Sequence, residues 1–340
     1  MISRPDRQED RRKPRPETRA AQTGPVDMTV LVARLTERDR WILRMLHEHR
    51  VLTTNQLAAL AFTNTVIALR RLNRLHRYGV LERFRPLRTR GSAPMHWVLA
   101  PPGASVLAAE VGISVRELGY NHQRTLAIAH SLHLTHTLGV NTWFTTLTAH
   151  APHDERGQQA RVQAWWSQTR CQRLWGDLAR PDAFGRYTLA EATLDFFLEY
   201  DLASTTLTRV AAKLHGYSEL ARTTGIPTPV LLWTPTTMRE ANARTALRQT
   251  WQRLPDPEAV PVATAAAELL TPKPEASPAD QVWLPLDRDS DRLRLHELAT
   301  VWPGRTPPAD ELHSEQNWAP SGGLILLAPP PPTPPLYESW

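Results

Sequence analysis

Three acidic residues near the middle of the chain stand in or beside an apolar stretch. Glu199 and Asp201 close the segment ATLDFFLEYD, and Asp182 follows a proline about seventeen residues before Glu199. A carboxylate in an apolar strand is costly to bury, and it is tolerated mainly when it is paired, hydrogen-bonded or bound to a cation. The types and spacing of these acids therefore predict a site, and metal-assisted phosphate chemistry is one use for it.

Strand geometry predicts that the three carboxylates converge. Residues two apart in a strand face the same way, so Glu199 and Asp201 should project together. A hairpin that turns near Ala190 would place Asp182 opposite residues 198–199. Carboxylate oxygens are the ligands that Mg²⁺ prefers, and Mg²⁺ beside a scissile phosphate activates water. The prediction is a Mg²⁺ site formed by Asp182, Glu199 and Asp201, with Mg²⁺ as the candidate cofactor.

Lys213 is the lysine nearest to these acids, in a predicted helix over residues 205–221. The generic nuclease motif is Pro-Asp, a spacer, then acid-any-Lys, and this chain has Asp201 at the lysine position. A lysine that steadies developing charge could come from the helix instead. Asp182, Glu199, Asp201 and Lys213 are therefore the candidate catalytic residues of a metal-dependent DNA nickase or endonuclease. The alternative, which stays open, is a set of structural acids in a nuclease-derived fold without activity.

The segments around these residues predict a mixed sheet flanked by helices. Apolar and β-branched stretches predict strands at 162–166, 181–187, 192–200, 228–233 and, more weakly, 260–267. Helical periodicity predicts helices over residues 122–150, 205–221 and 238–254. One long helix, three strands, a helix, a strand and a helix is the order of a restriction-endonuclease-like core. We therefore predict a nuclease-like α/β domain over residues 122–270.

The first hundred residues predict a different kind of domain. Residues 31–100 hold thirteen arginines against four acids, although the whole chain has a formal net charge of only +6. Such a basic module is expected where a protein meets a polyanion. Three short helices, the last over residues 64–78, precede strands at 80–84 and 95–99 with a basic loop between them. This pattern predicts a winged helix-turn-helix over residues 33–100 that binds DNA, so the predicted fold class is α+β or α/β.

The third helix of this module should face the DNA with its polar side. Its predicted inner stripe is Val66, Leu69, Leu72 and Leu75. The residues predicted to contact DNA are Arg70, Arg71, Asn73, Arg74 and Arg77 in the helix, and Arg88 and Arg90 in the wing. The alternative is a winged helix that is used for protein contacts.

The remaining segments predict connectors and tails. We expect a disordered basic arm at 1–32, a helical connector at 101–121, an extension packed on the core at 271–302 and a Pro-rich tail at 303–340. No apolar run has the roughly 18–20 residues that a membrane helix needs, and the first thirty residues lack the apolar core of a signal peptide. The only cysteine, Cys171, excludes an internal disulfide framework. These features predict a cytoplasmic protein without a membrane partner.

Three segments of the chain resemble the actinobacterial replication-relaxation family: LTERDRWILRMLHEHRVLTTNQLAAL, RRLNRLHRYGVLERF and LARPDAF…FFLEYDLAS…KLHGYSEL. The similarity covers about residues 33–300. That family is associated with plasmid replication and with DNA relaxation or mobilisation, so the resemblance implies a role on plasmid or other mobile-element DNA. It also implies an acid at the end of the first sheet strand, where this chain has Gln168.

Two functions follow as hypotheses. The first is a DNA-binding factor of plasmid or mobile-element replication, with double-stranded DNA and replication or mobilisation proteins as partners. The second is a non-enzymatic transcriptional or replication regulator whose C-terminal domain binds a protein partner or forms a homodimer. A relaxase with a tyrosine nucleophile would need a His-apolar-His metal strand. The chain offers only His47-Glu48-His49 inside a predicted helix, so we set that function aside.

Overall fold

The fold is that of a computed structural model, which describes residues 28–88, 91–153, 156–270, 275–302 and 326–335, with backbone alone for 11–16 and 87–88. The described chain divides into two compact units. The first unit holds the residues up to Asn141 together with 326–335, and the second unit runs from Thr142 to residue 302. Our prediction placed this division near residue 121, so the first unit is larger than expected.

The first unit is mostly helical and carries a small antiparallel sheet. Its elements are β1 (Arg11–Pro16), α1 (Met28–Arg34), α2 (Glu37–His49), β2 (Leu52–Thr53), α3 (Thr54–Ala61), α4 (Thr65–Tyr78), β3 (Leu81–Arg88), β4 (His96–Leu99), α5 (Pro101–Glu110), α6 (His122–Ala127), η2 (Ile128–His130) and the first half of α7 (Leu134–Ala149). Local sequence explains the helix ends. Thr36 and Thr53 each form a capping box with the residue three positions later, and Asn64 caps α4. Gly79 ends α4 in the left-handed conformation.

The sheet of the first unit has the strand order β1-β3-β4-β2. The edge strand β1 lies inside the predicted disordered arm, and the prediction was wrong for these residues. β1 pairs antiparallel with β3, with a register shift between Arg12 and Arg15. Proline cannot donate to a sheet and is confined to positions such as an edge strand. Pro14 and Pro16 are therefore compatible with this edge. The other residues of the arm before Met28 lie outside the described part of the chain.

The inner face of α4 differs from the prediction. Ala68, Leu72 and Leu75 are buried, whereas Val66 is 60% exposed and Leu69 is 37% exposed. At 100° per residue, Ala68, Leu72 and Leu75 lie on one line along the helix, and Val66 lies on the opposite side. The apolar type of Val66 and Leu69 predicts core positions, but only the side of the helix that carries Ala68, Leu72 and Leu75 is buried.

Within the predicted connector, Pro101 starts α5, where a proline suits the first turn. One predicted helix differs from the structure. The predicted helix over residues 122–150 is interrupted at Ser131, which is extended and whose hydroxyl accepts a hydrogen bond from the backbone N–H of His133 at 3.1 Å. A serine that bonds nearby backbone in this way competes with helix continuation. The chain resumes as α7 at Leu134.

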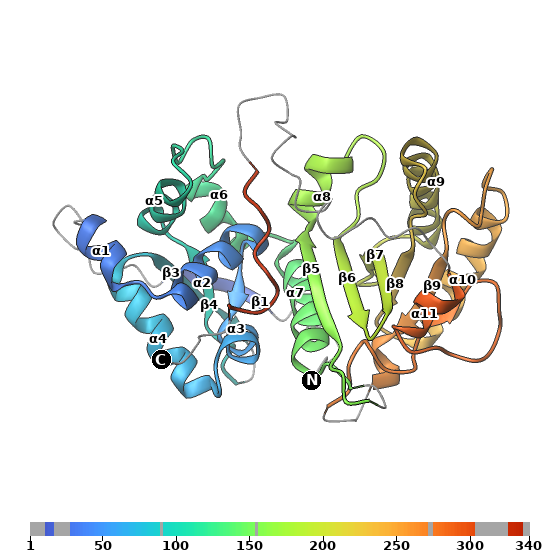
Figure 1. Ribbon diagram of the computed structural model, residues 1–340, viewed down its shortest axis with the longest axis horizontal. Coiled ribbons are helices and arrows are strands. Elements are labelled where there is room, and N and C mark those ends of the chain that lie inside the picture. Colours follow the sequence, from blue (N-terminus) through green and yellow to red (C-terminus); the bar gives the residue numbers. More distant parts are fainter. Residues whose placement is uncertain are drawn as a thin grey trace. The chain divides into compact units, whose positions relative to one another are not determined.

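The second unit is built around a six-stranded mixed sheet (Figure 1). Its elements after α7 are β5 (Arg161–Ser167), α8 (Gln168–Trp175), β6 (Ala183–Leu189), β7 (Ala192–Tyr200), α9 (Leu207–Thr224), β8 (Val230–Thr234), α10 (Thr237–Trp251), β9 (Val262–Ala266), η3 (Ala267–Leu270), β10 (Leu284–Pro285) and α11 (Glu297–Val301). Strands β5 to β7 are antiparallel, β7 to β9 are parallel, and β10 closes the edge antiparallel to β9. The mixed α and β content of the prediction is confirmed, whereas α8 was not predicted.

Helices cover both faces of this sheet. The ring of Trp143 in α7 lies 5.7 Å from that of Phe196, and the ring of Tyr217 in α9 lies 5.3 Å from that of Phe197. Successive residues of a strand point to opposite faces, so α7 and α9 lie on opposite sides of β7. Helix α10 packs against α9 and therefore shares its side. The second unit thus has three layers, with α7 on one face of the sheet and α9 and α10 on the other. The side chain of Glu199 lies on the face that α9 and α10 cover.

The hairpin of β6 and β7 has the predicted geometry. Leu189 pairs with Ala192, and Ala190 in the turn has a positive φ of 52°. Ala183 pairs with Leu198, and the backbone N–H of Asp182 donates to the carbonyl of Leu198 at 3.0 Å. Asp182 therefore lies across from the end of β7, as the sequence predicted.

Part of the Pro-rich tail packs on the first unit. The indole N–H of Trp41 in α2 donates to the carbonyl oxygen of Pro331 at 2.7 Å, and Pro330 and Pro332 are buried. This segment is therefore not a plain spacer, and the rest of the tail from residue 303 lies outside the described part. Within the described residues, no helix is long and apolar enough to cross a membrane.

Candidate functional site

Glu199 is the centre of a buried polar cluster in the second unit. The residue lies at the end of β7 and is 6% exposed. The hydroxyl of Tyr217 donates to Oε1 of Glu199 at 2.5 Å, and the ammonium of Lys213 forms an ion pair with Oε2. Lys213 and Tyr217 are four residues apart in α9, so they project from the same face of the helix. The structure thus brings together Glu199 and Lys213, two of the predicted catalytic residues.

Burial controls the protonation of this cluster. Burial raises the pKa of Glu199 to about 7, because it outweighs the lowering by Lys213, and Asp182 raises it further. Burial lowers the pKa of Lys213, but Glu199, Asp182 and Asp201 raise it by more, so the ammonium form is favoured. Burial and the neighbouring Glu199 raise the pKa of Tyr217 well above its usual value. Glu199 is therefore the group that can exchange a proton near neutral pH.

Asp182 is held by the backbone of the neighbouring strand. Its carboxylate accepts a hydrogen bond at 2.8 Å from the N–H of Tyr200, and its side chain is buried. Because the backbone of Asp182 also bonds to Leu198, the residue fastens the start of β6 to the end of β7. This is the structural role that the sequence left open as an alternative.

Asp201 turns toward α10 and has its own cation. Nε of Arg239 lies 2.6 Å from Oδ2 of Asp201, and the N–H of Ala203 donates to Oδ1 at 2.9 Å. Asp201 is 8% exposed, so the guanidinium compensates a buried charge. The sequence did not identify Arg239, since no local pattern links two residues 38 positions apart.

The three carboxylates do not fit a metal ion in this arrangement. Glu199 and Asp201 are bound by Lys213 and Arg239, and Asp182 is bound by a backbone N–H. Among the described residues, no group of three or more His, Cys, Asp or Glu could hold a metal ion. Mg²⁺ binding remains a prediction, which titration of the protein with Mg²⁺ would test. What the cluster offers chemically is a carboxyl group that titrates near pH 7 beside an ammonium whose side chain is 41% exposed.

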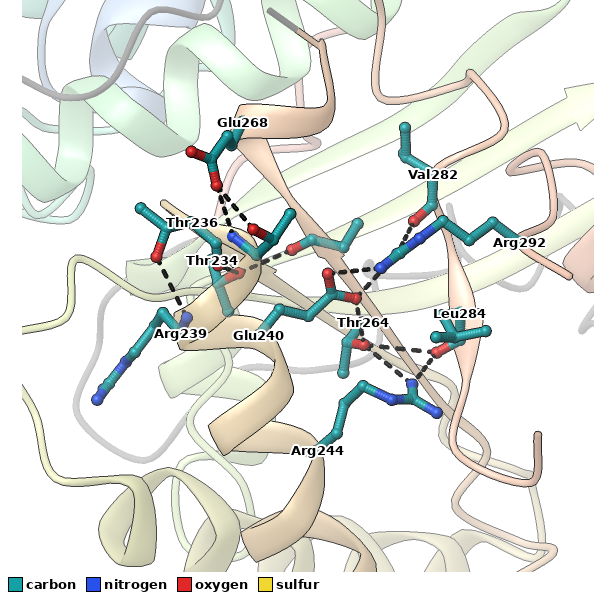
Figure 2. Close-up of polar contacts among 12 residues, drawn as sticks. Thr234, Thr236, Arg239, Glu240, Arg244, Thr264, Glu268, Val282, Leu284 and Arg292 are labelled. Carbon is teal, nitrogen blue, oxygen red and sulfur yellow. Dashed lines mark hydrogen bonds and ion pairs between the residues drawn. The ribbon is translucent and has the colours of Figure 1, made fainter. Parts of the chain in front are cut away.

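A second charged cluster, between α10 and the segment after β9, is structural (Figure 2). Glu240 accepts from Arg292 at 2.8 and 2.9 Å and from the hydroxyl of Thr264 at 2.7 Å. Arg244 donates to the hydroxyl of Thr264 and to the carbonyl oxygen of Leu284. It also donates to the carbonyl oxygens of residues 285 and 288. Burial and the neighbouring Arg248 lower the pKa of Arg244 to about 10. Arg244 and Arg292 line a cavity of about 540 Å³, but their terminal guanidinium nitrogens donate to protein oxygens. The cluster therefore fastens residues 284–292 to the sheet.

The arginines of α4 in the first unit fall into two groups. Arg70, Arg74 and Arg77 are exposed on the side opposite the buried stripe, as predicted. Nε of Arg71 donates at 2.8 Å to Oδ1 of Asp39, whose side chain is completely buried. Arg71 therefore compensates a buried carboxylate and does not belong to the exposed group.

The other residues predicted to contact DNA are placed as follows. Asn73 is half-buried, and its side-chain oxygen accepts a hydrogen bond from Arg83 in β3. The side chain of Arg88 and all of Arg90 lie outside the described part of the chain. Gln168, the position where the resemblance implied an acid, is the first residue of α8. The exposed arginine face, which we define as Arg70, Arg74 and Arg77, is thus the part of the predicted DNA surface that is exposed among the described residues.

Comparison with known families agrees with the resemblance of the three segments. A family model described as replication-relaxation matches residues 43–231, which is more than half of the 340-residue chain. The chain belongs to the replication-relaxation family. The match spans both α4 of the first unit and the Glu199 cluster of the second. No curated protein and no solved structure matches this replication-relaxation protein.

Proposed function

We propose that this replication-relaxation protein binds double-stranded DNA through α4 of its first unit. Family membership supports a role in replication or relaxation. The observation that carries the proposal is the exposed arginine face of α4, formed by Arg70, Arg74 and Arg77. Arginines that bind DNA phosphates release counterions from the DNA. The affinity therefore falls steeply as the salt concentration rises. The order of α2, α3, α4 and the β3–β4 hairpin supports a winged helix-turn-helix, in which the third helix enters the major groove.

The experiment for DNA binding is a salt titration of affinity for a duplex. We expect the Arg70→Ala and Arg74→Ala variants to bind more weakly and each to lower the slope of log affinity against log salt by about one. Arg116→Ala is the matched control, because Arg116 is an exposed arginine of the same unit outside α4. Affinity that does not depend on salt, or equal losses in all three variants, would contradict the proposal.

We propose further that the second unit is a restriction-endonuclease-like domain. The order α7, β5, β6, β7, α9, β8 and the acids at the β6–β7 hairpin support this arrangement. Lys213 reaches Glu199 from α9, which fits a motif whose lysine has moved from the strand to the helix. Plasmid or mobile-element DNA would be its substrate if it cuts.

The second candidate function is a non-enzymatic regulator whose second unit binds a protein partner or a second copy of the chain. It is favoured by one observation, which is that Asp182, Glu199 and Asp201 are each already bound by protein groups. Incubation of supercoiled plasmid with Mg²⁺ or Mn²⁺ separates the two functions. Nicking that is lost in Asp182→Ala and Glu199→Ala supports the nuclease, and no nicking by the wild type supports the regulator. Nicking that survives both substitutions would exclude this cluster as the site.

A further inference from the structure

The N-terminal part of α4 exposes a group of apolar side chains that do not belong to the core. Val66, Ile67 and Leu69 are 60%, 45% and 37% exposed. In the described part of the chain, three of the nine exposed large apolar side chains thus fall within four residues. The core contacts of the helix are made by Ala68, Leu72 and Leu75. A cluster of exposed apolar side chains of this kind is typical of a contact surface.

The apolar group and the exposed arginine face form one continuous surface. Val66, Arg70, Arg74 and Arg77 follow one another at helical spacings of four, four and three residues, and Ile67 lies three residues before Arg70. The apolar side chains stand at the N-terminal end of the helix and the guanidinium groups follow toward its C-terminal end. A partner of this surface must therefore be anionic over most of its length and apolar at one point.

Double-stranded DNA has this combination of properties. Its phosphates are anionic, and the C5-methyl group of thymine is the apolar group that its major groove presents to a protein. In helix-turn-helix proteins, residues near the N-terminus of the recognition helix contact base edges. A protein partner would instead need an apolar side chain framed by acids.

We propose that Val66 and Ile67 contact thymine methyl groups in the major groove and give this protein a preference for thymine at the bases that they face. The inference rests on the proposed DNA binding through α4. The arginines supply affinity without regard to sequence, and the two apolar side chains supply part of the sequence preference.

The test compares thymine with uracil, which lacks only the methyl group. Duplexes enriched from a random-sequence library by the full-length protein are amplified with either thymidine or deoxyuridine triphosphate, and their affinities are measured at one salt concentration. Burial of one methyl group corresponds to about fourfold in affinity. We expect the thymine pool to bind about fourfold more tightly for each methyl contacted. We expect Val66→Ala and Ile67→Ala to reduce that ratio.

The matched control is Val111→Ala, because Val111 is an exposed valine of the same unit outside α4. Equal affinity of the two pools, with a steep salt dependence, would overturn the thymine preference and leave DNA binding intact. A Val66→Ala variant that weakens both pools equally would also overturn it. Absence of binding to either pool would remove both proposals and would favour a protein partner for α4.

Discussion

Replacing Glu199 by Gln removes a carboxyl group whose pKa burial raises to about 7. In the unfolded chain this carboxyl has its ordinary pKa of 4.5. Between these two values the folded protein binds more protons than the unfolded chain, so the free energy of unfolding falls as the pH rises. The contribution of Glu199 is complete below pH 4.5 and is lost as the pH passes through about 7. At about 1.4 kcal/mol per pKa unit, the loss is about 3 kcal/mol.

Denaturant unfolding of the wild type and of Glu199→Gln at pH 5 and pH 7.5 measures this effect. We expect the wild type to lose about 2 kcal/mol more than the variant between the two pH values, because at pH 5 the carboxyl of the unfolded chain is already mostly ionised. The variant keeps an uncharged partner for Tyr217, and Lys213 remains hydrated because its side chain is 41% exposed. We therefore expect Glu199→Gln to be at least as stable as the wild type at pH 7.5.

Glu219→Gln is the matched control, because Glu219 is an exposed acid of the same helix that is paired with Arg222. Its pH dependence should match that of the wild type. If the wild type and Glu199→Gln lose the same free energy between pH 5 and pH 7.5, the carboxyl group is not titrating in this range and the reasoning fails.

Three further perturbations test contacts that the structure assigns. Arg71→Ala leaves the buried carboxylate of Asp39 without its cation and should lower the free energy of unfolding by about 3 kcal/mol, measured by denaturant; a loss below 1 kcal/mol would contradict this role. Trp41→Phe removes the hydrogen-bond donor to the carbonyl oxygen of Pro331, which should weaken the packing of residues 326–335 by about 1 kcal/mol. Proteolysis of that segment should therefore become faster, and an unchanged rate would refute the contact. Arg244→Met leaves the carbonyl oxygens of residues 284, 285 and 288 without their donor, so amide hydrogen exchange should accelerate in residues 284–302. Unchanged protection there would show that these hydrogen bonds do not hold the segment in place.

The local patterns of the sequence determined most of the elements and one part of the site. The register of the β6–β7 hairpin followed from the apolar run and the turn near Ala190, and this register alone placed Asp182 opposite the end of β7. The spacing of Lys213 and Tyr217 in a predicted helix likewise put both on one face, where Glu199 meets them. These features depend on residues close in sequence, so periodicity is sufficient to predict them.

Only the tertiary structure decided which charges are available. Arg71 and Arg70 look alike in the sequence, but the fold places Asp39 of α2 beside Arg71 and leaves Arg70 exposed. In the same way, α10 brings Arg239 beside Asp201, a pairing that no local sequence pattern indicates. The physical reason is that a buried charge is compensated by whatever group the fold brings within a few ångströms, and that group is often distant along the chain.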